Sequence, residues 1–191
     1  MPNDVSKIVV NSAKGTGGWL WAPPGTALPT SLTAALNAAF QSLGLLSDAN
    51  IEETIGSSTT LIRDINGNPV RTVTSEHDVT YSFEALETNE IVLKLKHGTA
   101  NVTRVDGSPT VGEQLDWKIT GDALPTQPHV IELTDGVKTF RGVLPKAQVY
   151  ELGSSTMGAS EARRHPFGVR CYPDASGVKA YWYSNDNVLV P

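Results

Sequence analysis

A glycine-rich stretch near the start of the chain is the first feature whose residue types could do chemistry, because such turns can cradle phosphate groups. It covers residues 15–18 and is followed by Trp19. A phosphate-binding loop needs a lysine and a hydroxyl residue after its last glycine, and a dinucleotide-binding turn needs a third glycine where Leu20 stands. The stretch therefore predicts an entry into a first strand rather than a nucleotide site.

Three glutamates, Glu84, Glu87 and Glu90, lie three residues apart and could supply paired carboxylates. A glycosidase needs two such groups facing each other across a cleft, and this spacing alone does not place them so. The sequence also lacks the Gly-x-Ser-x-Gly turn of many serine hydrolases. We therefore expect solvated carboxylates near a strand-to-helix junction and no catalytic residue, with a small β-rich hydrolase that uses Glu84, Glu87 or a histidine as an alternative.

The histidines are scattered, and no two have the i, i+4 spacing that places both imidazoles on one face of a helix. The single cysteine, Cys171, excludes a thiolate cluster and an intrachain disulfide. Its strand-like surroundings predict a buried, inert thiol. We therefore expect no metal site and no cofactor. The histidines are His77, His97, His129 and His165.

Tryptophans and tyrosines raise a second alternative, a β-sandwich that binds carbohydrate or decorates a capsid. Sugar-binding platforms need exposed, coplanar rings, whereas Trp19 and Trp21 share one face of a short strand and better suit a core or a subunit contact. The other aromatic residues of this set are Trp117, Tyr181, Trp182 and Tyr183.

Composition and charge bound the class of protein. The 191 residues are 39% hydrophobic and 18% charged, which predicts one folded domain. The net charge of −5 argues against a basic nucleic-acid-binding surface. No apolar run approaches the roughly 20 residues that span a bilayer, and the start of the chain lacks a secretory pattern. We therefore expect a protein made in a cytoplasm, without a membrane partner.

Short apolar runs separated by turn dipeptides dominate the chain and predict hairpins, because glycine in the turn can adopt positive φ. The clearest has Asp135 and Gly136 between runs of β-branched and aromatic residues. Residues 79–86 alternate between apolar and polar and predict a further strand. Together these features predict a mainly β fold, a β-sandwich or partial barrel. The other predicted turns lie at 66–67, 106–107 and 174–177.

Two segments break this pattern. Residues 32–43 have apolar side chains at helical spacing, with a serine before them and a glycine after them that can cap the ends, so we predict a helix. Residues 90–97 are ambiguous. Their apolar residues alternate as in a strand, yet either Thr88 or Asn89 can cap a helix that Gly98 ends.

The linear order of these segments is informative. A Trp-Leu-Trp strand precedes a Pro-Pro-Gly turn, a Ser/Thr-rich run at 57–60 leads into a predicted hairpin, and a strand runs into residues 87–89 before an apolar segment ends at Gly98. Over roughly residues 18–188 this order resembles the major tail tube proteins of long-tailed, siphovirus-type bacteriophages. In that family the apolar segment is a helix on the side of a β-sandwich, so the resemblance favours a helix at 90–97.

The resemblance implies a structural protein without catalytic residues, whose subunits form hexameric rings that stack into a hollow tail tube. Genomic DNA would pass through the lumen without specific binding. The expected partners are further copies of the chain and the tape measure, tail terminator and distal tail proteins. The subunit would be assembled in the host cytoplasm and reside in the virion tail.

We expect a single tail tube domain over residues 1–191. It would carry an N-terminal arm at 1–17, a long polar assembly loop at 57–74 and a C-terminal tail at 185–191. The loop is long, polar and hairpin-like, so it is expected to be a poor independent structure that orders against a partner.

Two sets of residues are candidates for function in such a tube. The long loop would make the contact between rings, through Arg63, Asn66 and Arg71. Carboxylates that line the lumen would repel the phosphates of passing DNA. The candidates for this role are Glu52, Asp78 and Glu84.

Overall fold

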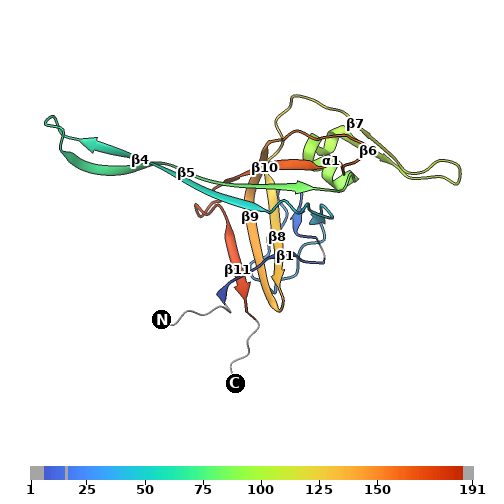
Figure 1. Ribbon diagram of the computed structural model, residues 1–191, viewed down its shortest axis with the longest axis horizontal. Helices are drawn as coiled ribbons and strands as arrows, with labels where there is room; N and C mark the ends of the chain where they lie inside the picture. Colours follow the sequence, from blue (N-terminus) through green and yellow to red (C-terminus); the bar gives the residue numbers. More distant parts are fainter. Residues whose placement is uncertain (1–6, 16, 187–191) are drawn as a thin grey trace, which may run out of the picture.

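A computed structural model describes residues 7–15 and 17–186, which are built mainly from β-strands (Figure 1). These residues contain one α-helix, α1 (Glu90–His97), followed by a 3-10 turn at Thr99–Asn101. The predicted mainly β fold with a flanking helix is confirmed. The strands are β1 (Ser12–Ala13), β2 (Trp19–Trp21), β3 (Gln41–Ser42), β4 (Glu52–Arg63), β5 (Pro69–Ala85), β6 (Val102–Val105), β7 (Gln114–Trp117), β8 (Gln127–Asp135), β9 (Lys138–Glu151), β10 (His165–Tyr172) and β11 (Tyr181–Asn185).

Most of the strands belong to one continuous sheet in the order β3-β2-β8-β9-β10-β5-β4, with β1 beside β8 and β11 beside β9. The long hairpin β8–β9 makes this arrangement possible, because each of its outer edges serves two partners. β8 pairs with β2 and then β1, while β9 pairs with β11 along its first half and with β10 along its second. Side chains from β2, β5, β8, β9 and β10 meet in the main core.

The turns predicted at 66–67, 135–136 and 174–177 are present, but the last does not make a hairpin. At 106–107 there is no turn, because β6 and β7 are joined by a longer loop over residues 106–113. Gly136 (φ 59°) lies in the β8–β9 turn, as predicted. At residues 174–177 the carboxylate of Asp174 accepts hydrogen bonds from the backbone N–H groups of Ser176 and Val178, as in a turn. The flanking strands β10 and β11 nevertheless pair with β9 rather than with each other, because β9 is long enough to offer both of them one edge.

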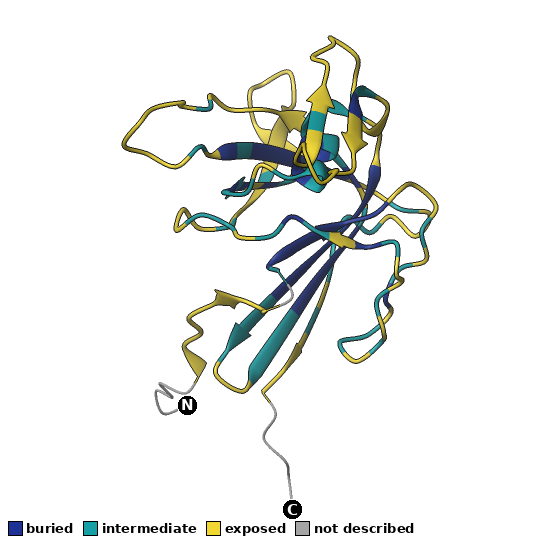
Figure 2. Cartoon of the chain, turned by 90° about the vertical axis from the view of Figure 1, so that its right-hand side faces the viewer, coloured by how far each residue is buried: buried dark blue, intermediate teal, exposed yellow. Residues whose placement is uncertain are grey.

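The core is organised by alternation along β2, whose residues are all buried. Trp19 and Trp21 point into the main core, and Leu20 points into a second cluster. The Trp19 ring stacks on Phe83 with 4.0 Å between ring centroids, and its indole N–H donates to Nδ1 of His129 at 2.9 Å. Trp19 therefore joins β2, β5 and β8. In Figure 2 the buried segments follow these central strands, whereas the projecting hairpins are exposed.

The ambiguous segment after β5 is the helix that the resemblance favoured. The side chain of Asn89 accepts a hydrogen bond from the backbone N–H of Val92 at 2.9 Å and caps the start. Gly98, with φ at 87°, ends the helix. Alternation alone suggested a strand because the buried positions on this short helix are irregularly spaced. They are Val92, Leu93 and Leu95.

The helix predicted over residues 32–43 is wrong, since these residues form bends and a turn before they enter β3. Arg141 of β9 accounts for the difference. Its guanidinium donates to the backbone carbonyls of Ser31 at 2.9 Å and Ala34 at 2.7 Å, which in a helix would accept intrahelical hydrogen bonds. The same guanidinium pairs with Glu132 at 2.5 Å, and the two side chains are only 7% and 5% exposed. The segment is therefore shaped by a buried cation.

The segment at residues 57–74, predicted to be a long hairpin-like loop, is the outer part of the hairpin β4–β5, and it is paired as two strands rather than left as a loop. The ladder runs from Glu52 opposite Ser82 to Arg63 opposite Pro69. Serine and threonine predicted a loop by their polarity, yet threonine also has a high preference for strands and pairs well across them.

The two ends of the chain are described only in part. Within the predicted arm at 1–17, β1 pairs with β8, and residues 1–6 and 16 lie outside the described residues. The predicted tail at 185–191 starts at the last residue of β11, and residues 187–191 likewise lie outside the described residues.

The buried ion pair gives the first prediction. Replacing Arg141 by methionine leaves the Glu132 carboxylate buried without its guanidinium partner, with Lys14 at 3.5 Å, and should lower the free energy of unfolding by about 3 kcal/mol. The double variant R141M/E132L should regain part of this loss, because no uncompensated charge remains. Urea unfolding at neutral pH measures both effects, and a single variant as stable as the unchanged protein would show that the pair is not a structural requirement.

The buried imidazole gives a second prediction. Burial lowers the pKa of His129 from 6.5 to about 3. The unfolded chain therefore binds a proton at this residue between these pH values while the folded chain does not, so its contribution to stability is complete above pH 6.5 and is lost as the pH falls. From pH 7 to 5 the loss from this residue is about 2 kcal/mol.

His129→Gln, which keeps an acceptor for Trp19, should flatten this part of the pH dependence. Burial also lowers the pKa of His165, to about 4. His165 is present in both proteins, so its contribution to the pH dependence cancels when the two are compared. Urea unfolding of both proteins at pH 7 and pH 5 is the measurement. Equal pH slopes would contradict the role of His129.

Candidate assembly surfaces

The hairpin β4–β5 leaves the body of the protein as a two-stranded ribbon (Figure 1). β10 covers the second edge of β5 only as far as the pair Cys171 and Val79, so within the described chain both hairpin edges lack a partner strand from Asp78 outward. We call residues 55–78 the ribbon. None of its described side chains is buried. Isolated two-stranded hairpins are marginally stable in water and open edges invite pairing, so the ribbon has the properties of an assembly element.

The three residues predicted to contact the next ring all lie at the end of the ribbon. The turn is shaped by Asp64, whose carboxylate accepts from the backbone N–H groups of Asn66 at 2.9 Å and Asn68 at 2.8 Å. These hydrogen bonds, chiefly those from Asn68, lower the pKa of Asp64. Arg63 donates to a backbone carbonyl of the turn at 2.8 Å. Arg71 stands on β5 outside the turn, and its guanidinium is therefore the better placed of the two for a partner.

The ribbon has two unlike faces, because direct cross-strand partners share a face and successive residues alternate. One face continues the core side of the sheet and carries uncharged side chains and one histidine; we call it the apolar face. On it Ile55 is 62% exposed and Leu61 is 43% exposed. Its residues are Ile55, Ser57, Thr59 and Leu61 of β4 with Thr72, Thr74 and His77 of β5.

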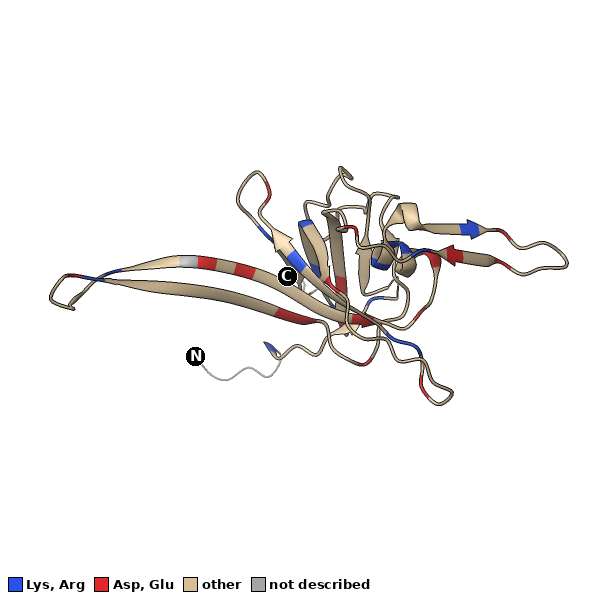
Figure 3. Ribbon diagram, turned by 90° about the horizontal axis from the view of Figure 1, so that it is seen from above, with Lys and Arg blue, Asp and Glu red and all other residues tan. Residues whose placement is uncertain are grey.

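The opposite face, which we call the acidic face, carries all three residues predicted to line a lumen, and toward the tip it also carries Ile62 and Arg71. Glu52 stands opposite Ser82, and Asp78 and Glu84 alternate with core residues on the same strand as Ser82. The structure therefore brings these carboxylates onto one surface, on the side of the sheet away from the core. In Figure 3 the acidic residues (red) of the hairpin lie at the start of β4 and along the half of β5 nearer the body.

Sequence reasoning missed two further carboxylates of the acidic face. Glu76 lies two residues before Asp78 and accepts a hydrogen bond from Ser58 at 3.2 Å. Glu151 of β9 borders a hollow of about 680 Å³ together with Glu52 and Glu84. The alternation of Glu76 and Asp78 was the available signal, but it fell between segments interpreted as a loop and a strand.

Glu84 differs from the other members of the acidic face because its charge is compensated. Arg164 contacts the Glu84 carboxylate at 3.2 Å and the Asp48 carboxylate at 3.0 Å. The hydroxyl of Ser47 also donates to the Glu84 carboxylate, at 3.1 Å. These carboxylates, Glu84 first, raise the pKa of Arg164. Glu52 and Asp78 are exposed and contribute more to a negative surface.

A second two-stranded hairpin, β6–β7, projects from the end of the molecule opposite the ribbon (Figure 1). It forms a separate sheet, with Val102 opposite Trp117. Arg104 holds it in place by pairing with Glu113 at 2.8 Å and with Glu90 of α1 at 3.7 Å. The hairpin and the segment after it expose apolar side chains. They are Val105 (48% exposed), Val111 (50%), Trp117 (37%) and Ile119 (80%).

The other glutamates considered for catalysis have separate structural partners. Glu87 accepts from the backbone N–H of Leu45 at 2.7 Å and from the side chain of Asn89 at 3.0 Å. Glu90 pairs with Lys94 at 2.5 Å, and this contact is the main cause of its lowered pKa. The three-residue spacing therefore reflects contacts that hold α1 and the loop before it.

The histidines and the cysteine are buried or dispersed. His165 hydrogen-bonds to Thr88 at 2.9 Å, and burial keeps it and His129 neutral at neutral pH. Burial raises the pKa of the Cys171 thiol to about 12, so the prediction of a buried thiol is confirmed. In the described ranges no group of three His, Cys, Asp or Glu residues could hold a metal ion. Nor do those ranges contain a helix long and apolar enough to cross a membrane.

The tryptophans do not gather into a platform for sugar rings. Those of β2 belong to the core, and the two exposed ones stand on different strands, Trp117 on β7 and Trp182 on β11. The indole N–H of Trp182 lies 3.3 Å from both the Glu53 carboxylate and the Tyr81 hydroxyl. Trp182 therefore closes the open side of the core near the base of the ribbon.

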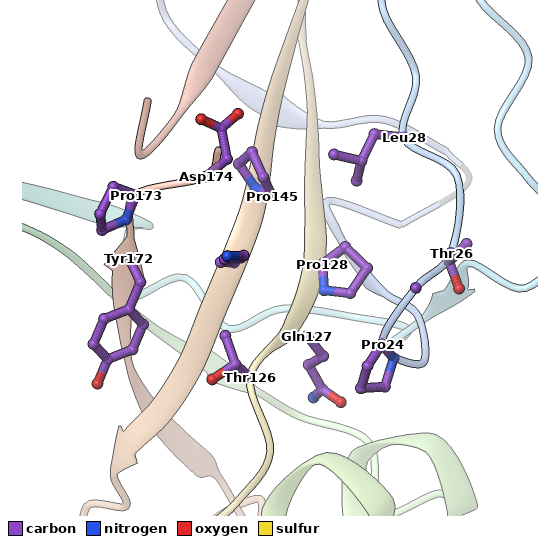
Figure 4. Close-up of a pocket in the computed structure, with 12 residues that line it drawn as sticks. Pro24, Thr26, Leu28, Thr126, Gln127, Pro128, Pro145, Tyr172, Pro173 and Asp174 are labelled. Carbon is purple, nitrogen blue, oxygen red and sulfur yellow. The ribbon is translucent and has the colours of Figure 1, made fainter. Parts of the chain in front are cut away.

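A shallow pocket of about 730 Å³ lies between the turn after β2, the start of β8 and the β10–β11 turn (Figure 4). Proline has no N–H to donate, so its walls suit an apolar side chain better than a polar substrate. The hydroxyl of Tyr172 on its rim donates to Gln148 at 2.9 Å. The apolar lining comes from Pro24, Leu28, Pro128, Pro145, Tyr172 and Pro173.

Chains in solved structures of contractile injection systems are similar to this one over most of its length. A chain of the extended sheath–tube complex of an extracellular contractile injection system, PVC, is 8% identical with a TM-score of 0.44, and 90% of each chain is covered. The tube terminating cap of the anti-feeding prophage is 12% identical with a TM-score of 0.45, covering 95% of this chain and 98% of that one. No curated protein is significantly similar in sequence.

One protein-family model matches the entire chain, residues 1–191, and it describes a phage tail tube protein. The match agrees with the observed fold, in which a mainly β body holds a projecting ribbon and the candidates for catalysis serve structural contacts. The chain therefore belongs to the phage tail tube protein family.

Proposed function

We propose that this protein is a non-enzymatic structural subunit that forms hexameric rings, that the rings stack into the tail tube, and that the tube conducts the genome into the host cell. The ribbon is the observation that carries this proposal. It has open edges, exposed apolar residues and, among its described side chains, none that is buried, and such an element is a liability in a monomer. Repeated copies give it a surface on which to pack.

Ring formation needs a contact between two different surfaces of the same chain, because such a head-to-tail contact closes into a ring when the rotation is right. The sheet supports this, since its last strand, β4, has an edge with no partner in the described chain. Strands from neighbouring copies would then continue one sheet around the lumen.

The acidic face supports the conduit. In the proposed tube it lines the lumen, where Glu52, Asp78 and the newly identified Glu76 repel DNA phosphates. Salt limits each repulsion to about 8 Å at physiological ionic strength, but the groups recur in every subunit and every ring. A basic lining would instead bind DNA with an affinity that falls as salt rises.

The proposed partners follow from the position of a tube in a virion. Further copies of the chain bind laterally and axially, and tape measure, tail terminator and distal tail proteins meet the interior and the two ends. The subunit is assembled in the host cytoplasm and then resides in the virion tail. DNA passes through without specific binding.

Shortening the ribbon tests the proposal. Residues 57–77 are replaced by an Asn-Gly turn, and both proteins are concentrated and viewed by negative-stain electron microscopy at low and high salt. The unchanged protein should form hollow tubes or six-fold rings, and the shortened protein should remain monomeric. Its melting temperature should stay within a few degrees, because the deleted residues belong to no core cluster. Tubes formed by the shortened protein would remove the ribbon from assembly.

A charge change tests the lumen. Glu52→Lys or Asp78→Lys in assembled virions should slow triggered DNA release, and added salt should relieve the effect because it screens the new attraction. Asp135→Lys is the matched control, since it makes the same charge change in the β8–β9 turn, outside the acidic face. Equal release rates for Glu52→Lys, Asp78→Lys and the control would show that the acidic face does not line the lumen.

A further inference from the structure

Two hairpins mark the two ends of the molecule's longest axis, the ribbon at one end and β6–β7 at the other (Figure 1). The outer part of each consists of two strands only. A two-stranded hairpin needs a third strand or a packed face to be stable alone. The molecule therefore has the same deficiency at both ends, and a second copy placed end to end can correct both at once.

Exposed apolar side chains match at the two ends. At the ribbon tip Ile65 is fully exposed and Val70 is 66% exposed. At the opposite end Ile119 is 80% exposed and Trp117 is 37% exposed. Each aliphatic side chain buried in a contact contributes roughly 1.5 to 3 kcal/mol before the costs of association, so each end has a hydrophobic anchor for the other.

Charges at the two ends are opposite in sign. The ribbon tip carries Arg63 and Arg71 against the single carboxylate Asp64, which is bound within the turn. The β6–β7 end carries Asp106, Glu113, Asp116 and Asp122 against two cations, Lys118 and Arg104. Arg104 pairs with Asp106 and Glu113, and in the described chain no salt bridge joins Lys118 or any other basic side chain to Asp116 or Asp122, so this end is net acidic.

The proline-lined pocket is a poorer receptor for the tip. Lys146 is among its lining residues and would face the arginines of the tip, and the pocket's carboxylate, Asp174, already accepts hydrogen bonds from its own turn and from Tyr181. The β6–β7 end offers unpaired carboxylates instead.

We propose that the ribbon tip of one copy docks on the β6–β7 end of a second copy, with Ile65 packed against Trp117 and Ile119 and with Arg71 facing Asp116. The inference rests on the proposed tube and names the axial contact within it. The two surfaces differ, so the contact is heterologous and does not close on itself. It therefore repeats along the tube axis and stacks the rings.

Disulfide trapping tests the contact with the full-length chain. Ile65→Cys and Ile119→Cys are prepared separately, mixed and oxidised, and the covalent dimer is quantified on a non-reducing gel. The native Cys171 is 2% exposed and does not interfere. Val137→Cys, which replaces a 69% exposed residue in the β8–β9 turn, takes the place of Ile119→Cys in the control mixture.

The dimer yield of the Ile65→Cys and Ile119→Cys mixture should exceed that of the control mixture and of either variant alone by at least fivefold. Equal yields would overturn the proposed contact. If the unchanged protein still forms tubes in that case, the tube function stands and the rings stack through another surface. A specific cross-link without tubes or rings would support the contact and contradict the tube.

Charge reversal gives a second readout. R71E and D116R should each reduce the protein that sediments as assemblies at least tenfold, and R71E/D116R should restore it, because the ion pair is re-formed with opposite polarity. Both residues are exposed, so neither change should affect the melting temperature. Single variants that assemble normally, or a double variant no better than either single one, would contradict the pairing of Arg71 with Asp116.

Discussion

The open backbone edge of the ribbon is the constraint on which the rest of the structure depends. Every N–H and C=O group on a strand needs a hydrogen-bonding partner, and water supplies it along the ribbon of a single copy. The apolar side chains of Ile55, Leu61 and Ile65 are all exposed, and their contact with water is unfavourable. The body must hold such an element in one direction, and β5 does this because its inner half pairs with β10 and places Tyr81 and Phe83 in the core.

Buried polar groups make that body rigid. Trp19 fills the centre through both its ring and its N–H, which His129 accepts. On the other side of the sheet, Arg141 joins Glu132 to the irregular chain before β3 through four hydrogen bonds from one guanidinium. An unpaired partner in either set would cost far more than the pair contributes. These groups therefore specify one geometry for the sheet from which the ribbon projects.

Features set by neighbouring residues could be predicted from the sequence, and features set by distant partners could not. The turn at Gly136 and the alternation of residues 79–86 are local, and both are confirmed. The helix at 32–43 failed because Arg141, a hundred residues away, takes the carbonyls that a helix needs. The turn at 174–177 was correct, but its strands pair with β9 because of that strand's length.

Face assignment within the ribbon shows the same limit and also what the structure adds. Sequence alone treated residues 57–74 as a polar, hairpin-like loop of unknown register, so the lumen carboxylates were chosen by charge alone. In the register of β4 with β5, Glu52, Glu76 and Asp78 fall on one side, and Ile55 and Leu61 on the other. The helix α1 packs on the core side, which the apolar face continues. If the acidic face lines a lumen, the apolar face must point outward, where it can only be covered by the body of another copy. In such a tube the inner part of the acidic face would repel DNA and the apolar face would pack on a neighbour, while the tip, where Arg71 stands on the acidic side, would reach the next ring.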